Sequence, residues 1–142
     1  MISFSFVDTP ILKLKKSVLK SCIKDLINSE SFKSKDVSFV FCSDEHLLSI
    51  NQEYLKHDYY TDIITFDYCE GANISGDLFI SVDRVIENAS NNSVTFVEEL
   101  KRVLFHGVLH LCGYKDKNSK DKTVMTCKED FYLDLFKSDL IL

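Results

Sequence analysis

The sequence predicts an α+β fold in which a mixed four-stranded sheet packs against helices. Segments with the two-residue period of strands alternate with segments of helical period, and two strand-like segments near the middle are predicted to form a hairpin. No linker, internal repeat or low-complexity tract interrupts this order. The chain has 142 residues, 45% of them hydrophobic, and a chain of this length buries roughly two-thirds of its unfolded surface. We therefore expect a single domain over residues 1–142.

The first half of the chain is predicted to contain two strands, each followed by a helix. Apolar residues alternate with serines over residues 2–6, which is typical of a half-buried strand. An apolar stripe of helical spacing covers residues 10–28, with a proline where a first helical turn tolerates it. The alternation resumes over residues 37–42. A serine or an aspartate at positions 43–44 then caps a helix that runs to Leu55.

The middle of the chain is predicted to form the hairpin. Residues 61–68 are rich in β-branched and aromatic side chains, which favour a pleated, buried surface. Two glycines bound the segment 71–76, which is expected to turn. Residues 77–82 then form the returning strand.

Three helices are predicted to follow the hairpin. A short one covers about residues 83–89. The longest periodic segment, residues 94–111, stops at Gly113, a residue type favoured just after a helix end. A lysine-rich stretch over residues 115–122 leads into a final helix that ends near Phe136.

Composition limits the cellular setting and the partners. No apolar run approaches the roughly 18 residues of a membrane span, and the first residues lack the pattern of a secretion signal, so no membrane partner is expected. Five cysteines without a C-x-x-C pair indicate a reduced, cytoplasmic protein. The net charge of -5 weakly disfavours nucleic acid as a partner. It does not exclude RNA binding through local lysine patches, because net charge averages over the whole surface.

Two histidines and an aspartate have the spacing of a metal site. His106 and His110 lie one turn apart on one helix face, so both imidazoles can bind one ion. Gly113 can adopt a positive φ and turn the chain back, which lets Asp116 add a third ligand. Three ligands leave an open position for water, as in catalytic zinc sites. The alternative is that both histidines are hydrogen-bonded core residues and that Gly113 only ends the helix.

This spacing is related to the zinc-protease signature H-E-x-x-H-x-x-G-x-x-H. Asp116 stands in place of its third histidine, and Gly107 stands in place of its glutamate. Because that glutamate is the general base of the proteases, we expect the metal site but not the peptidase mechanism. Cys112 lies about 200° from His110 around the helix and is expected to pack in the core.

The segment HGVLHLCGYKD, residues 106–116, closely resembles the pattern HGxLHLxGYDH of the YbeY family. These proteins are bacterial metal-dependent endoribonucleases and rRNA maturation factors. Asn51, Asp58 and the segment TDIITF at residues 61–66 are similar to a second block of the family, and GDLFIS at residues 76–81 to its next strand.

The resemblance implies a fold, an activity and a set of partners. It implies a single-domain α+β hydrolase with a zincin-like metal-site helix, in which His106, His110 and Asp116 bind one Zn²⁺ ion. The two histidines would then act in catalysis through the metal-bound water. It further implies that the protein cuts single-stranded RNA, acts in 3′-end maturation of 16S rRNA and in ribosome quality control, and works with the small ribosomal subunit.

Two departures from the family pattern concern the site. Lys115 and Asp116 occupy the positions of the family's Asp-His pair, so Asp116 carries the role of the third ligand. Leu55 stands where the family usually has an arginine that is thought to face the substrate. The neighbouring Lys56 and His57 can provide a cation or a proton donor there, and the alternative for His57 is a solvated loop residue.

Basic side chains indicate where RNA phosphates would bind. Arg102 precedes His106 by one turn and can hold a phosphate, or else it forms an ion pair with Glu98 or Glu99. Other candidates are two groups of lysines, for which a solvated helix face is the alternative. The first group follows one face of the first predicted helix and the second flanks the third metal ligand: Lys13, Lys16, Lys20 and Lys24; Lys115 and Lys117.

Two other functions are compatible with the sequence. One is a metal-dependent hydrolase of another phosphoester or amide. The other is an RNA-binding ribosome-assembly factor with a structural metal, which the leucine at position 55 favours. The sequence predicts no oligomeric state.

Overall fold

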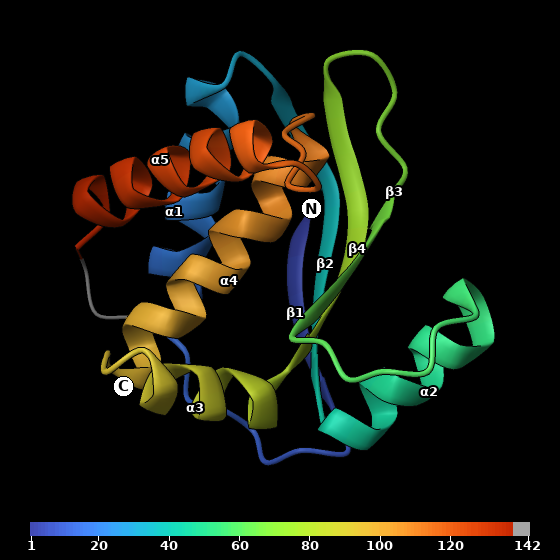
Figure 1. Ribbon diagram of the computed structural model, residues 1–142. Helices are drawn as coiled ribbons and strands as arrows, with labels where there is room; N and C mark the ends of the chain where they lie inside the picture. Colours follow the sequence, from blue (N-terminus) through green and yellow to red (C-terminus); the bar gives the residue numbers. More distant parts are fainter. Residues whose placement is uncertain (138–142) are drawn as a thin grey trace.

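The computed structural model describes residues 1–137, which form a four-stranded sheet and five helices (Figure 1). The elements follow one another in this order: β1 (Ile2–Val7), α1 (Lys16–Ser29), β2 (Lys33–Cys42), α2 (Asp44–Leu55), β3 (Ile63–Asp67), β4 (Asn73–Ser81), α3 (Val82–Asn91), α4 (Phe96–Leu111) and α5 (Ser119–Leu135). The predicted α+β class is confirmed. Within the described residues, no helix is both long enough and apolar enough to cross a membrane.

The sheet is mixed and has the strand order β1-β2-β4-β3. The strand β2 is parallel to both β1 and β4, and α1 crosses over between β1 and β2. The strands β3 and β4 are antiparallel, with Thr65 opposite Leu78, so the predicted hairpin is confirmed. As a result, β1 and β3 form the two opposite edges of the sheet.

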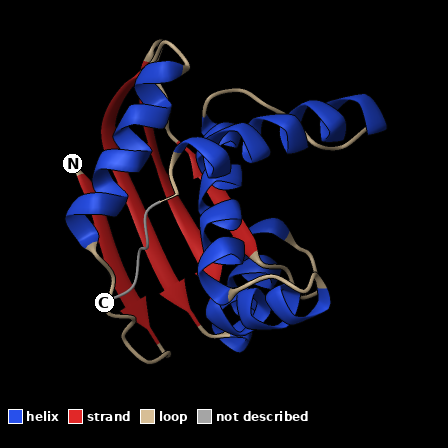
Figure 2. Cartoon of the chain, turned by 90° about the vertical axis from the view of Figure 1, so that its left-hand side faces the viewer, coloured by secondary structure: helices blue, strands red, loops and turns tan. Residues whose placement is uncertain are grey.

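Most helices cover one face of the sheet. Figure 1 shows α1, α4 and α5 on one side and α2 alone on the other, and Figure 2 shows α1 near the β1 edge with α4 farther across the sheet. The main core lies between the sheet and the larger helical layer, and it includes Phe39, Leu78 and Leu104. A smaller hydrophobic cluster, which includes Leu47 and Ile50, packs α2 against the opposite face of the sheet.

Several elements begin at other residues than the sequence predicts; β2, for example, starts at Lys33 rather than at residue 37. The helix α1 starts at Lys16 rather than near residue 10, because the preceding segment is irregular and buries Leu14 in an isolated bridge. The strand β4 already starts at Asn73 and contains Gly76, which was expected to turn. A Cβ atom on Gly76 would lie 2.6 Å from the backbone oxygen of Phe66, so this glycine allows close strand packing. The turn itself has Gly71 at φ +57°.

Local capping and a glycine explain where α4, the helix that carries both histidines, begins and ends. Thr95 caps α4 by accepting a hydrogen bond from the backbone N–H of Glu98. After α4 ends, Gly113 adopts φ +101°, as the sequence predicts, and the chain turns back. The turn places residues 114–118 beside the last turns of α4 before Asn118 caps α5.

Candidate metal centre

Gly107 lets the helix that carries both histidines lie close to the sheet. A Cβ atom at this position would come within 2.4 Å of Leu78 Cδ2 and 2.7 Å of Ile63 Cδ1. Position 107 therefore faces the sheet, and the neighbouring His106 and His110 are directed to the β3 side of α4, where Ile63 and Thr65 line the same cleft. A side chain at position 107 would have to displace the ends of the Leu78 and Ile63 side chains.

The structure brings the three predicted ligands together. The Nε2 atoms of His106 and His110 lie 3.0 Å apart, and Asp116 Oδ2 lies 3.1 Å from the first and 3.3 Å from the second. These three are a group of donor atoms close enough to hold one metal ion. Cys112 is not part of the group, and burial raises the pKa of its thiol to about 12, as expected for a packed side chain.

The second nitrogen of each imidazole has a hydrogen-bond acceptor. His106 Nδ1 lies 2.6 Å from Glu129 Oε2 on α5, and His110 Nδ1 lies 2.8 Å from the backbone oxygen of Tyr114. Because a carboxylate and a carbonyl only accept, both Nδ1 atoms are positioned to donate a proton, and the Nε2 atoms are the ones that would bind a metal ion. Such contacts fix the tautomer and the ring orientation of metal-binding histidines. Two imidazole nitrogens and one carboxylate oxygen with this arrangement fit Zn²⁺.

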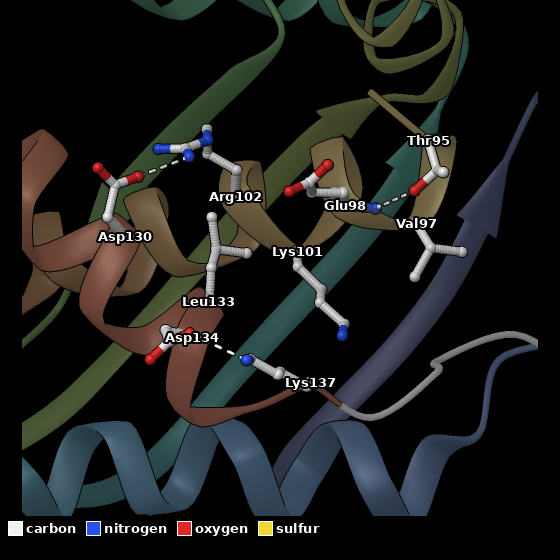
Figure 3. Close-up of a pocket in the computed structure, with 9 residues that line it drawn as sticks. All are labelled: Thr95, Val97, Glu98, Lys101, Arg102, Asp130, Leu133, Asp134 and Lys137. Atoms are coloured by element: carbon white, nitrogen blue, oxygen red, sulfur yellow. Dashed lines mark hydrogen bonds and ion pairs between the residues drawn. The ribbon is translucent and has the colours of Figure 1, made fainter. Parts of the chain in front are cut away.

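Arg102 belongs to the support of this centre rather than to the cleft. Its Nη1 atom donates to Glu129 Oε1 at 2.8 Å and its Nη2 atom to Asp130 Oδ1 at 2.7 Å. Figure 3 shows the guanidinium directed toward Asp130 in a hollow next to Glu98. Arg102 therefore forms ion pairs, as one of the two predictions had it. Its partners are Glu129 and Asp130 on α5 rather than Glu98 or Glu99.

Glu129 holds His106 from a buried position. The Glu129 side chain is only 8% exposed. Burial alone would lower the pKa of the His106 imidazole, but the hydrogen bond with Glu129 and the charges of Glu129 and Asp116 raise it above its ordinary value. Glu129 lies 23 residues beyond His106, and no local motif points to it.

The three ligands line an open cleft of about 630 Å³. Its other walls come from β3, from the end of α2 and from the loop between them, and include Leu55, His57 and Asp62. Burial raises the pKa of Asp62, although the nearby His106 opposes this shift. Asp62 and Asp67 are thus carboxyl groups in the cleft, in addition to Asp116, that the ligand spacing did not identify.

Comparisons with known proteins identify the family of this chain. A family model described as endoribonuclease YbeY matches residues 6–137. The chain belongs to the YbeY family. A protein of Flavobacterium psychrophilum named endoribonuclease YbeY is 47% identical over 136 residues, which cover 96% of each chain. A YbeY protein of Christiangramia forsetii is 50% identical over 117 residues, which cover 82% of each chain.

A solved structure has the same fold as this YbeY-family chain. The solution structure of TM1509 from Thermotoga maritima matches with a TM-score of 0.68 and 28% sequence identity. The match covers 96% of this chain and 89% of the Thermotoga chain.

The predicted basic residues are divided between two distant regions of this YbeY-family protein. Lys117 lines the cleft of the metal centre, and Lys115 is exposed in the same loop. Lys20 and Lys24 line a separate hollow with Lys35, beside β1 and therefore at the opposite edge of the sheet from β3. The predicted stripe is also shorter than expected, because Lys13 precedes α1 and only Lys16, Lys20 and Lys24 are helical.

Proposed function

We propose that this protein is a zinc-dependent endoribonuclease that cuts single-stranded RNA in the cytoplasm. The proposed setting is the 3′-end maturation of 16S rRNA and ribosome quality control, with the small ribosomal subunit as partner. The observation that carries the proposal is the convergence of the His106, His110 and Asp116 donor atoms in an open cleft. Membership of the YbeY family supports the RNA substrate.

In this proposal some residues of the centre bind the metal ion and another orients a ligand. His106, His110 and Asp116 would hold the ion, and the open side of the cleft would admit the RNA phosphate. When bound, zinc lowers the pKa of a coordinated water and polarises a phosphoryl oxygen. Glu129 would accept a hydrogen bond from His106 Nδ1 and so direct Nε2 to the ion.

Nearby cations would attract the RNA backbone to the cleft. Lys117 lies in the cleft wall and Lys115 beside it. His57 lies in the opposite wall, with its ring stacked on Tyr59 and its Nδ1 atom 2.9 Å from the Tyr59 hydroxyl. We assign these residues to phosphate contact. The helical lysines Lys16, Lys20 and Lys24, together with Lys13, would bind only a longer RNA that also reaches the β1 edge.

Metal analysis tests the centre directly. Purified wild-type protein is expected to hold one equivalent of zinc, and the double variant His106→Ala, His110→Ala is expected to lose it because Asp116 alone provides one donor atom. The control is Lys24→Ala, at the opposite edge of the sheet, which should keep a full equivalent. A double variant with a full zinc equivalent would contradict the site.

An RNA cleavage assay tests the activity. Wild type should cut a single-stranded rRNA fragment, and His110→Ala should reduce the rate by about a hundredfold or more, since the metal-bound nucleophile is lost. Equal cleavage by both proteins would indicate a contaminating nuclease. A duplex of the same sequence should be cut poorly by wild type.

The cleft itself favours one alternative function. The apolar Leu55 lines the cleft and supplies no charge for the substrate. This favours an RNA-binding assembly factor with a structural metal. Tight, salt-dependent binding of the RNA fragment without any cleavage by the zinc-loaded protein would support this alternative.

A hydrolase of a different substrate is the other alternative. Cleavage of another phosphoester but not of RNA would support it.

A further inference from the structure

Glu30 lies at the centre of a hydrogen-bond cluster that joins three separate parts of the chain. It follows α1, and its side chain is only 8% exposed. Tyr114 Oη donates to Glu30 Oε1 at 2.6 Å. Lys128 Nζ donates to Oε2 at 3.1 Å, and the Tyr132 hydroxyl donates to the same oxygen. Both carboxylate oxygens of Glu30 are therefore bonded.

The Glu30 side chain is suited to act as a charged acceptor. Burial alone would raise its pKa, but the hydrogen bonds from Tyr114, Tyr132 and Lys128 lower the pKa below its ordinary value. Lys128 also lies over the Tyr114 ring, with Nζ 5.5 Å from the ring centroid. The Tyr114 side chain is thus held at its hydroxyl and at its face.

Tyr114 connects this cluster to the metal centre. Its backbone oxygen accepts the hydrogen bond from His110 Nδ1 at 2.8 Å. Tyr114 also lies between Gly113, where the chain reverses, and the segment that carries Asp116. The position of one residue therefore affects both the orientation of His110 and the path of the chain to the third ligand.

We propose that Glu30 is a positioning residue for the metal centre, acting through Tyr114 on His110 and Asp116. The end of α1 thereby sets the affinity of a metal site that lies about 80 positions farther along the chain. The inference rests on the proposed metal site and adds to it a residue that contacts none of the ligands in the described structure. Lys128 and Tyr132 of α5 bond the same carboxylate, and these two bonds attach α5 to the end of α1.

Metal affinity of the purified apo-protein tests the proposal without any activity measurement. Tyr114→Phe removes the hydroxyl but keeps the backbone oxygen, and Glu30→Gln removes the charge. Each is expected to weaken Zn²⁺ binding by about tenfold in competition with a chelating dye, the lower end of the usual effect of partners outside the ligand shell. The double variant should bind zinc no more weakly than the single variant with the lower affinity, because both changes break the same connection.

Tyr132→Phe is the matched control. It also removes a tyrosine hydroxyl from Glu30, but it leaves the bond between Tyr114 and Glu30 in place. It is expected to lower the melting temperature of the apo-protein while keeping the zinc affinity within about twofold of wild type. The visible absorption of the Co²⁺-loaded proteins provides a second measurement, and it should change in Tyr114→Phe and Glu30→Gln but not in Tyr132→Phe.

The outcomes separate the inference from the function on which it rests. Zinc affinities of Tyr114→Phe and Glu30→Gln that equal wild type would overturn the positioning role and leave the metal centre intact. An equal loss of affinity in all three variants would overturn it as well, since general destabilisation would then explain the loss. A wild-type protein that binds no zinc would overturn the metal centre and the inference together.

Discussion

The most informative residue outside the ligand set is Glu129. It is buried, it bonds the first histidine ligand and it is itself paired with Arg102. Its neighbour Asp130 also pairs with Arg102 but has a side chain that is 59% exposed. Both acidic residues pair with Arg102, but of the two Glu129 is the one that also bonds His106.

This difference makes Glu129 and Asp130 a matched pair for mutagenesis. We expect Glu129→Gln to weaken zinc binding by about 10- to 100-fold, because the charged acceptor of His106 Nδ1 is lost. Asp130→Asn should change the affinity by less than about threefold, since an exposed ion pair contributes little. Zinc titration of the two apo-proteins measures both values. Similar affinities for the two variants would show that Glu129 does not orient His106.

At the scale of elements, two glycines set how closely the site-bearing helix and the hairpin pack. Gly107 brings α4 onto the sheet, and Gly76 lets β4 approach Phe66 and Leu111. The obstacles to a side chain differ in kind. At position 107 they are the ends of the Leu78 and Ile63 side chains, whereas at position 76 the nearest atom belongs to the backbone.

We expect Gly76→Ala to be more destabilising than Gly107→Ala. The change at position 107 should lower the free energy of unfolding by about 1–2 kcal/mol, because side chains can shift and alanine favours the helix. The change at position 76 should lower it by about 3 kcal/mol, since the Phe66 carbonyl cannot move without disturbing the strand pairing. Urea unfolding of both variants measures the difference, and the reverse order would contradict this account.

The sequence predicts those features that depend on neighbouring residues. The serines at positions 3 and 5 alternate with the buried Ile2 and the half-buried Phe4 and Phe6, which is why β1 is found where expected. The three proposed ligands follow from spacing, because they lie on one helix face and one short loop. The partners Glu129 and Glu30 do not follow, because they lie 23 and 84 residues from the groups that they bond. The predicted start of α1 near residue 10 was wrong, because tertiary burial of Leu14 overrides local helical spacing.

At the scale of the whole molecule, Glu30 joins the end of α1, the loop that carries Asp116 and the helix α5, and we expect it to affect the acid stability of the fold. Its pKa is lowered in the folded protein relative to an ordinary value of 4.5. A carboxyl group with a depressed folded pKa stabilises the fold above its unfolded pKa. It loses that contribution as the pH falls through the folded pKa.

Glu30→Gln should therefore reduce the dependence of stability on acid. The free energy of unfolding of wild type minus that of the variant is expected to be constant above about pH 5 and to decrease as the pH falls below about 4.5. Chemical denaturation of the metal-free proteins across this range measures the difference. A difference that is independent of pH would show that Glu30 titrates normally in the folded state.

All three ligands lie within residues 106–116, and this has a consequence for the linkage between metal binding and folding. In an unfolded chain these donors are separated by short loops, so they can meet on one ion at a small entropic cost. A ligand stabilises a fold only by the excess of its affinity for the folded over the unfolded chain. The acceptors Glu129 and Tyr114 O are held in place by the folded structure alone. The thermal stabilisation that the proposed zinc ion would confer is therefore expected to depend on these acceptors more than on the ligands themselves.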